Sequence, residues 1–284
     1  MLAAPMQTRP LFAVGILTAA LGVLLTLRAV SSAPSPALAA PSPPAPQAAL
    51  QPTATVTTSS IAGAEVTPEI TTLTGDDAFR LLVFDVPLAG AQLRVRDVGM
   101  GRDLAHVLAE SGASLVVNGG FFDPAERPEG LVISAGATLS PRSDTLGGGV
   151  VALVDGRASL AAAEGFVAAP RTDFAIQARP RLVVDGKSGI ARDDGRAAER
   201  TAICVREQGR ALEVIVARGE APGRGPTLAL LADMLVSRGC EGALNLDGGP
   251  STGVAWREHG EVRGLAPRGP VRHAIAVWVA TSGE

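Results

Sequence analysis

Two glycine pairs in this sequence can support chemistry, because each follows an apolar run and lies beside polar or acidic side chains. The segments are Asn118-Gly119-Gly120-Phe121-Phe122-Asp123 and Asn245-Leu246-Asp247-Gly248-Gly249-Pro250-Ser251-Thr252-Gly253. Paired glycines let backbone N–H groups approach an oxyanion closely, and a neighbouring acidic residue can serve as acid, base or metal ligand. Either segment alone is most simply a turn, since Asn-Gly and Asp-Gly are common turn pairs. Two of them favour a shared site.

Short strands and two helices are predicted to position these segments. Residues 114–117 and 243–246 are the apolar strands that end at the two glycine pairs. Further β-rich runs lie at residues 79–86, 92–97, 150–154, 174–177, 181–184, 201–206, 212–217 and 274–279. Apolar residues at helical spacing predict helices over 103–111 and 227–237. Because strands and helices do not alternate regularly, we expect an α+β fold, a mixed β-sheet flanked by helices in a single globular domain.

The first 64 residues differ in composition from the remainder. Residues 11–27 carry no charge, which predicts a signal peptide or an uncleaved membrane anchor within residues 1–30. Residues 31–64 are rich in Pro, Ala, Ser and Thr and contain no charged residue, which predicts a disordered linker. We therefore expect residues 65–284 to form a domain outside the cytoplasm, periplasmic or secreted, held at the membrane by the N-terminal segment.

Charge and cysteine content indicate which ligands this protein is not expected to bind. The formal net charge of -3 gives no electrostatic case for nucleic acid, which requires clustered Lys and Arg. Cys204 and Cys240 lack metal-ligand spacing; an exported domain lets them pair, and two buried free thiols are the alternative. The charged run of residues 192–196 is interpreted as a solvated loop. We expect neither a metal nor a cofactor.

Five segments, in this order, resemble the phosphodiester glycosidase family. They are Val117-Asn118-Gly119-Gly120-Phe121-Phe122, Ala175-Ile176-Gln177, Pro180-Arg181-Leu182-Val183, Arg200-Thr201-Ala202-Ile203 and Asn245-Leu246-Asp247-Gly248-Gly249-Pro250-Ser251. Residues 270–277 are similar to the last strand of that family, so the resemblance covers roughly residues 79–279. It implies a hydrolase that releases the sugar from an N-acetylglucosamine-1-phosphodiester-like substrate, such as a phosphorylated polysaccharide, and leaves a phosphomonoester.

The resemblance implies a role for several side chains. Asp247 is the first candidate for a catalytic carboxyl group, because it ends a predicted strand beside a glycine pair. Asp123 and Glu129 are candidates for the second carboxyl group that glycoside hydrolysis usually needs. Since a phosphate leaving group needs little protonation, a single carboxylate is the alternative. Arg200 is expected to bind the phosphodiester charge through a bidentate contact.

Substrate contacts are expected from polar groups and from the glycine pairs. Asn118 and Gln177 are expected to bind sugar hydroxyls or an acetamido group, with a structural hydrogen bond as the alternative for each. The remaining expected contacts are Gly119, Gly120, Gly248, Gly249 and Ser251.

The sequence departs from the family pattern at three positions. Arg179 and Cys204 replace glycine, and His273 replaces asparagine. We expect Arg179 to alter the leaving-group side of the pocket.

Two functions other than catalysis are compatible with these motifs. The first is a domain that binds envelope polysaccharide without cleaving it; an aromatic content of only 3%, with no Tyr, counts mildly against stacking on sugar rings. The second is a structural envelope protein in which the glycine motifs are only turns.

Overall fold

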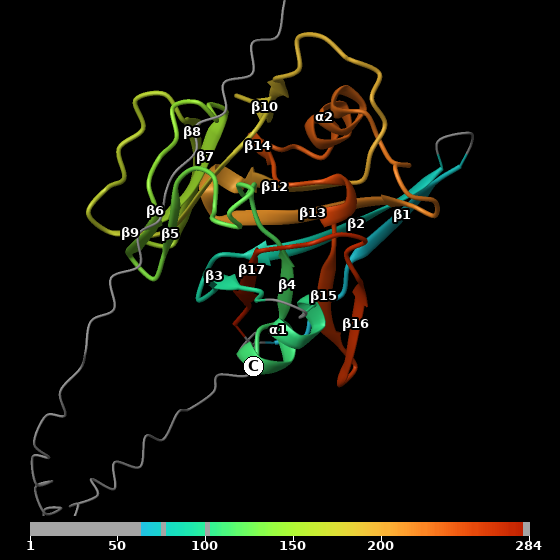
Figure 1. Cartoon of the computed structure of the whole chain (residues 1–284), viewed down its shortest axis with the longest axis horizontal. Coiled ribbons are helices and arrows are strands. Elements are labelled where there is room, and N and C mark those ends of the chain that lie inside the picture. The colour runs from blue at the N-terminus through green and yellow to red at the C-terminus, as the bar shows by residue number, and fades with distance from the viewer. Residues whose placement is uncertain (1–63, 75–77, 100–102, 281–284) are drawn as a thin grey trace, which may run out of the picture. The chain divides into compact units, whose positions relative to one another are not determined.

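The computed structural model describes residues 64–74, 78–99 and 103–280 (Figure 1). The predicted membrane segment and residues 31–63 of the predicted linker lie outside the described residues. Among the residues that are described, neither helix has the length and apolar character needed to cross a bilayer. These residues form three β-sheets and two α-helices.

The largest sheet has seven strands, and its inner strands are buried on both faces whereas the edge strands are exposed. In spatial order the strands are β1 (Glu69–Leu73), β2 (Phe79–Pro87), β13 (Ala211–Gly219), β12 (Arg200–Arg206), β14 (Gly242–Asn245), β10 (Arg181–Val184) and β11 (Lys187–Ser188). Leu82 and Phe84 of β2 pack into a central core, whereas Leu81 and Val83 pack in the layer beneath helix α2 (Leu228–Ser237). Burial on both faces explains why these strands have near-continuous apolar sequences.

The second sheet carries helix α1 (Leu104–Ser111) on its outer face. Its strands in spatial order are β16 (Glu261–Leu265), β15 (Val254–Glu258), β4 (Leu115–Asn118), β17 (His273–Trp278) and β3 (Gln92–Asp97). Ala274 and Ala276 of β17 face α1, and Ile275 and Val277 face the central core. Figure 1 shows α1 and α2 on the outer sides of their respective sheets.

The third sheet completes the central core. Its strands in spatial order are β6 (Ala137–Ser140), β5 (Val132–Ser134), β9 (Thr172–Ala178), β7 (Gly149–Val154) and β8 (Arg157–Ala162). Phe174 and Ile176 of β9 join the same core as Phe84 of β2 and Ile275 of β17. One shared core therefore fixes the positions of all three sheets relative to one another.

The predicted fold class is confirmed in part: two helices flank β-sheets, but the described residues are mostly strand, and the prediction of one mixed sheet is wrong. Every strand pair of the described sheets is antiparallel. Short connections explain the pairs that are consecutive in the sequence: β12 and β13, for example, are joined by residues 207–210, whereas a parallel pair needs a crossover of a dozen or more residues.

Both predicted helices are confirmed, and a side chain caps the start of each. The Asp103 carboxylate accepts a hydrogen bond of 2.8 Å from His106 N–H, and Gly112 ends α1 in the left-handed conformation, with φ 68°. The Thr227 hydroxyl accepts a hydrogen bond of 3.2 Å from Leu230 N–H at the start of α2. Each capping side chain satisfies an N–H that has no partner within the helix.

The two cysteines form a disulfide, which decides between the alternatives that the sequence leaves open. Cys204 lies in β12 and Cys240 lies between α2 and β14, with a Cα–Cα distance of 5.6 Å. The bond ties the helical layer to the centre of the seven-stranded sheet. A covalent link of this kind is typical of an oxidising compartment.

Candidate active site

A cavity of about 640 Å³ lies where five segments of the chain meet. These are the loop after β4, the β9–β10 connection, the β11–β12 loop with the first residue of β12, the first residue of α2, and the end of β14 with the loop that follows it. The lining comprises Phe121, Arg179, Pro180, Asp194, Arg196, Ala198, Arg200, Leu228, Asn245, Leu246, Asp247, Gly248, Gly249 and Pro250. The cavity therefore combines guanidinium, carboxylate and amide groups in one place.

The structure brings five of the sequence-predicted site residues into this lining and leaves seven outside it. The five are Asp247, Arg179, Arg200, Gly248 and Gly249. The seven are Asp123, Glu129, Asn118, Gly119, Gly120, Gln177 and Ser251.

Asp247 combines burial with hydrogen bonds that hold its loop. Its backbone N–H donates to Gly119 O at 3.2 Å, and its Oδ1 accepts from Gly248 N–H at 2.9 Å. Burial raises the pKa of the Asp247 carboxyl, and hydrogen bonds from Ser251 and Gly248 oppose that rise. The Ser251 hydroxyl has only one proton, and the carbonyl oxygen of Pro270, 3.1 Å away, is a second possible acceptor for it. A partly desolvated carboxylate in a cavity is suited to proton transfer.

Three arginines give the cavity a cationic wall. Arg179 comes from the β9–β10 connection, Arg196 from the loop before β12, and Arg200 from the first residue of β12. Arg200 is partly buried, and its side chain donates to two backbone carbonyls, of Arg196 at 2.8 Å and of Pro226 at 3.4 Å. Burial lowers the pKa of the Arg200 guanidinium, which nevertheless remains charged at neutral pH.

Asn245 lines the cavity but was not among the site residues predicted from the sequence. It is the first residue of the second glycine motif, residues 245–253. Its side-chain N–H groups donate to Arg179 O at 2.9 Å and to Leu246 O at 2.7 Å. The residue lines the cavity and is only 5% exposed. Its Oδ1 is buried and accepts no hydrogen bond from the residues that the structure describes. A buried acceptor without a partner is costly, so a ligand hydroxyl or amide N–H is the group that would satisfy it.

Asn118 connects the ends of three elements. Its Oδ1 accepts from Thr201 Oγ1 at 2.7 Å and from Gly253 N–H at 3.2 Å. Its Nδ2 donates to Asp247 O at 2.8 Å and to Gly119 O at 3.3 Å. The side chain is fully buried, and its amide makes four hydrogen bonds within the protein. In this structure Asn118 positions the loop that carries Asp247.

Gln177, in the third sheet, also uses its side-chain amide for four hydrogen bonds within the protein. Its Oε1 accepts from the N–H groups of Leu131 and Ser143, at 3.0 and 2.9 Å. Its Nε2 donates to the carbonyl groups of Ser143 and Gly147, at 2.7 and 2.9 Å. These four bonds tie two loops to the end of β9, which is the structural alternative that the sequence left open. Direct substrate contact by Asn118 or Gln177 stays a prediction.

The four glycine amides already have acceptors within the protein. Gly119 N–H donates to His273 O at 2.9 Å and Gly120 N–H to His273 Nε2 at 3.0 Å. Gly248 N–H donates to Asp247 Oδ1, and Gly249 N–H donates to the carbonyl of Glu199 at 2.8 Å. These glycines therefore shape the site through close backbone approach.

Two of the glycines leave no room for a side chain. A Cβ at Gly119 would lie 2.4 Å from His273 Cδ2, and one at Gly248 would lie 2.9 Å from Glu199 O. Glu199 itself is 2% exposed and forms an ion pair of 2.9 Å with Arg268. The loop after β14 thus packs against the backbone of Glu199, whose buried carboxylate is ion-paired.

The other two carboxyl candidates lie apart from the cavity lining. Asp123 forms an ion pair of 2.7 Å with Arg127, and hydrogen bonds from the Arg127 backbone and side chain lower the pKa of the Asp123 carboxyl. Glu129 is partly exposed, and its N–H donates to Phe121 O at 2.8 Å. Asp247 and Asp194 are the carboxylates in the cavity lining, so neither of the two residues predicted to supply a second carboxyl group lines it.

The charged loop of residues 192–196 contributes more than the sequence predicts. It was interpreted as solvated, and both Asp194 and Arg196 are exposed, but both line the cavity. A run of surface charges has no periodicity, so its position beside β12 and β14 is visible only in three dimensions.

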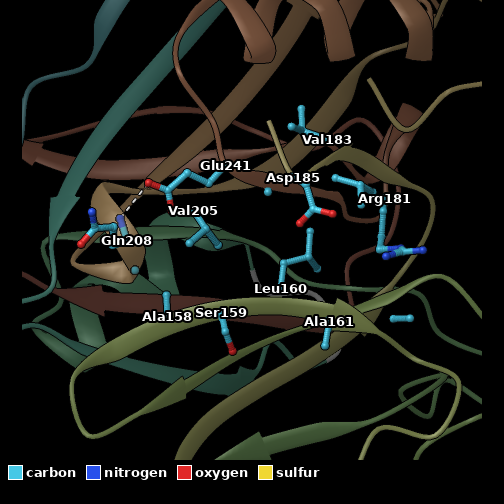
Figure 2. Close-up of a pocket in the computed structure, with 14 residues that line it drawn as sticks. Ala158, Ser159, Leu160, Ala161, Arg181, Val183, Asp185, Val205, Gln208 and Glu241 are labelled. Atoms are coloured by element: carbon cyan, nitrogen blue, oxygen red, sulfur yellow. Dashed lines mark hydrogen bonds between the residues drawn. The ribbon is translucent and has the colours of Figure 1, made fainter. Parts of the chain in front are cut away.

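A second cavity, of about 330 Å³, lies between β8 and the strands β10 and β14 (Figure 2). Figure 2 shows Glu241 accepting a hydrogen bond from Gln208 N–H, at 2.8 Å, and Arg181 and Asp185 at the opposite side. None of the sequence-predicted site residues is among the residues that line it. The larger cavity is therefore the candidate active site.

Comparison with known proteins agrees with this geometry. Two solved structures share the fold at a TM-score of 0.58 each: a hypothetical protein from Synechocystis, 16% identical, and the catalytic domain of zebrafish N-acetylglucosamine-1-phosphodiester alpha-N-acetylglucosaminidase, 17% identical. Each match covers 76% of this chain, with 62% of the Synechocystis chain and 83% of the zebrafish chain. The zebrafish structure is described as auto-inhibited by its pro-peptide.

No curated protein matches this sequence. The family profile described as phosphodiester glycosidase matches residues 111–278, which include β4, the β11–β12 loop and the loop after β14. That range is more than half of the chain and contains every residue that lines the larger cavity. The chain therefore belongs to the phosphodiester glycosidase family.

Proposed function

We propose that this protein hydrolyses a sugar-1-phosphodiester, of the N-acetylglucosamine-1-phosphodiester type, to a free sugar and a phosphomonoester. The observation that carries the proposal is the placement of Asp247, a carboxyl group with a raised pKa, in one cavity with Arg200. A carboxylate near the sugar and a guanidinium near the phosphate are the two groups that the reaction requires.

The hydrolytic step can be written with these two side chains. Water attacks the anomeric carbon while the Asp247 carboxylate accepts its proton. The bond between the anomeric carbon and the phosphate oxygen breaks, and its electron pair leaves with the phosphate. Arg200 offsets the additional negative charge that develops there. The proton then passes from Asp247 to solvent.

Asn245 supports a role in sugar binding. Its unpartnered Oδ1 can accept a hydrogen bond from a sugar hydroxyl or from the N–H of an acetamido group. Asn245 lies two residues before Asp247, so a sugar held by this amide lies beside the carboxyl group.

We also propose that the reaction takes place outside the cytoplasm, on an envelope or exopolysaccharide component. The Cys204–Cys240 disulfide supports this location, because such bonds persist in oxidising compartments. The apolar segment of residues 11–27 supports attachment of the domain to a membrane.

The test is phosphorus NMR of the full chain incubated with an N-acetylglucosamine-1-phosphodiester in oxygen-18 water. We expect the diester signal to be replaced by a monoester signal without an isotope shift, because cleavage on the sugar side places the heavy oxygen in the sugar. Asp247→Asn is expected to lower the rate by about 10²–10⁴-fold. Asp233→Asn, an exposed substitution of the same type on α2, is the matched control.

Three other outcomes would count against the proposal. Heavy oxygen in the phosphate would mean that the phosphorus–oxygen bond breaks and that the protein is a phosphodiesterase. Equal rates for Asp247→Asn and Asp233→Asn would remove Asp247 from the reaction. An unchanged diester that nevertheless raises the melting temperature of the protein would favour a polysaccharide-binding domain without catalysis.

A further inference from the structure

The cationic wall of the cavity has no carboxylate partner. Arg179, Arg196 and Arg200 all line the cavity, and in the described part of the chain none of them forms an ion pair. Other arginines of the described residues are ion-paired, as Arg268 is with Glu199 and Arg206 with Glu213. An unpaired set of guanidinium groups in a cavity is suited to an anionic ligand.

Arg196 and Arg200 are close neighbours of like charge. The Arg200 side chain donates to the backbone carbonyl of Arg196 at 2.8 Å, which holds the two residues together on one wall. Burial is the largest cause that lowers the pKa of Arg200; the charges of Asp194 and Asp193 oppose this effect, and the charge of Arg196 adds to it. Neither aspartate lies within ion-pair distance of the two guanidinium groups. Like charges held together are stabilised by an anion that both can contact.

The number of cationic groups indicates the charge of that anion. A phosphodiester carries one negative charge, which one bidentate arginine can meet. A phosphomonoester carries nearly two negative charges at neutral pH and has three acceptor oxygens. Two guanidinium groups that line one cavity match the monoester better than the diester.

We infer that Arg196 and Arg200 together bind a phosphate group as its dianion, so that the cavity holds a phosphomonoester more tightly than a phosphodiester. The inference rests on the proposed function only in that the monoester is the product of that reaction. It makes Arg196 a phosphate-binding residue, and it makes inorganic phosphate a competitive inhibitor.

The experiment compares two small ligands that differ by one methyl group and one charge. Isothermal titration calorimetry of the full chain is run with monomethyl phosphate and with dimethyl phosphate, at about pH 8, above the second phosphate pKa of about 6. We expect the wild type to prefer monomethyl phosphate. Arg196→Gln is expected to weaken its binding by about 10- to 100-fold, the value of a charge-assisted hydrogen bond, and to change dimethyl phosphate binding much less.

Arg192→Gln is the matched control, because Arg192 belongs to the same exposed loop but does not line the cavity. It is expected to bind both ligands as the wild type does. Arg196 is exposed and its side chain makes no ion pair among the described residues, so Arg196→Gln is expected to fold, which circular dichroism checks. Equal affinities of the wild type for the two ligands, or equal effects of the two substitutions, would overturn the inference.

The same proteins separate this inference from the proposed function. Diester hydrolysis by a wild type that shows no preference for monomethyl phosphate overturns the inference and leaves the proposed function in place. Selective, Arg196-dependent binding of monomethyl phosphate without any diester hydrolysis supports the inference and removes the proposed function.

Discussion

The Nε2 atom of His273 accepts a hydrogen bond of 3.0 Å from the backbone N–H of Gly120. The ring must therefore carry its proton on Nδ1 and be neutral, since a protonated imidazole has no free acceptor. Burial lowers the pKa of His273 to about 4, against a weaker opposing effect of Asp97. The neutral ring joins the start of β17 to the end of β4, beside the candidate active site.

His273 is expected to make stability depend on pH. Its pKa is about 4 in the folded protein and 6.5 when unfolded, so the unfolded chain binds the proton more readily. The stabilisation is fully present above pH 6.5 and is lost as the pH falls toward 4. The two values correspond to about 3 kcal/mol. Urea denaturation between these limits measures it.

The control for this effect is His273→Asn, which removes the titrating group. The difference in unfolding free energy between wild type and variant is expected to shrink as the pH falls, because only the wild type loses the histidine contribution. A difference that is constant across the range would contradict the neutral, buried ring.

The Asp247 carboxyl is expected to set the acidic limb of the pH–rate profile. Because the carboxylate acts as the base, the rate should fall as the pH drops through its pKa, which burial raises above the ordinary value of 3.8. Measuring kcat/KM against pH tests this. Residual activity of Asp247→Asn should show no such limb; the same limb in that variant would assign it to another group.

The Cys204–Cys240 disulfide is expected to contribute to stability by constraining the unfolded chain. The two residues are 36 positions apart, which corresponds to about 4 kcal/mol in the chain-entropy model. Replacing both cysteines with alanine should lower the unfolding free energy by an amount of that order. Adding a reductant should lower the stability of the wild type but not that of the variant. Equal responses of the two proteins would show that the bond is not formed.

Asn118→Ala distinguishes the positioning role seen in the structure from direct contact with substrate. The substitution leaves Gly253 N–H and Thr201 Oγ1 without their shared acceptor, so we expect a loss of about 1–3 kcal/mol or more. Since Asn118 also holds the Asp247 backbone, kcat should fall more than KM rises. A rise in KM alone, with unchanged stability, would instead indicate a sugar contact.

The sequence was sufficient to predict elements whose burial follows a regular pattern. Strand β3, with its alternating Leu93 and Val95, was predicted with the observed bounds, and Asp103 and Thr227 marked both helix starts. Strands such as β16 and β6 were not predicted, because β16 has no buried residue and β6 has one. A strand without a buried face shows no apolar alternation. Pairing direction was likewise predicted wrongly, because it depends on which segments meet.

The candidate site was predictable only where one strand end carried the signal. Asp247 stood out because it ends an apolar run beside two glycines. Gln177 also follows an apolar run, yet the structure directs its four hydrogen bonds to two loops. Arg196 had no cue, since its position depends on a loop that is far in the sequence from Asp247 and near it in space. Whether a polar side chain faces a ligand or a loop is a property of the whole fold.

The two walls of the cavity differ in how freely they can change during evolution. The Asp247 loop rests on buried contacts with Asn118, Glu199 and the glycine pairs, so substitutions that remove these contacts or add a side chain at Gly248 destabilise the fold. Arg196 sits on an exposed loop, where substitutions usually alter stability by within about 0.5 kcal/mol. Related proteins can thus acquire new charge preferences by mutating this loop while they keep the reaction unchanged. Specificity in this fold can diverge without passing through an unstable intermediate.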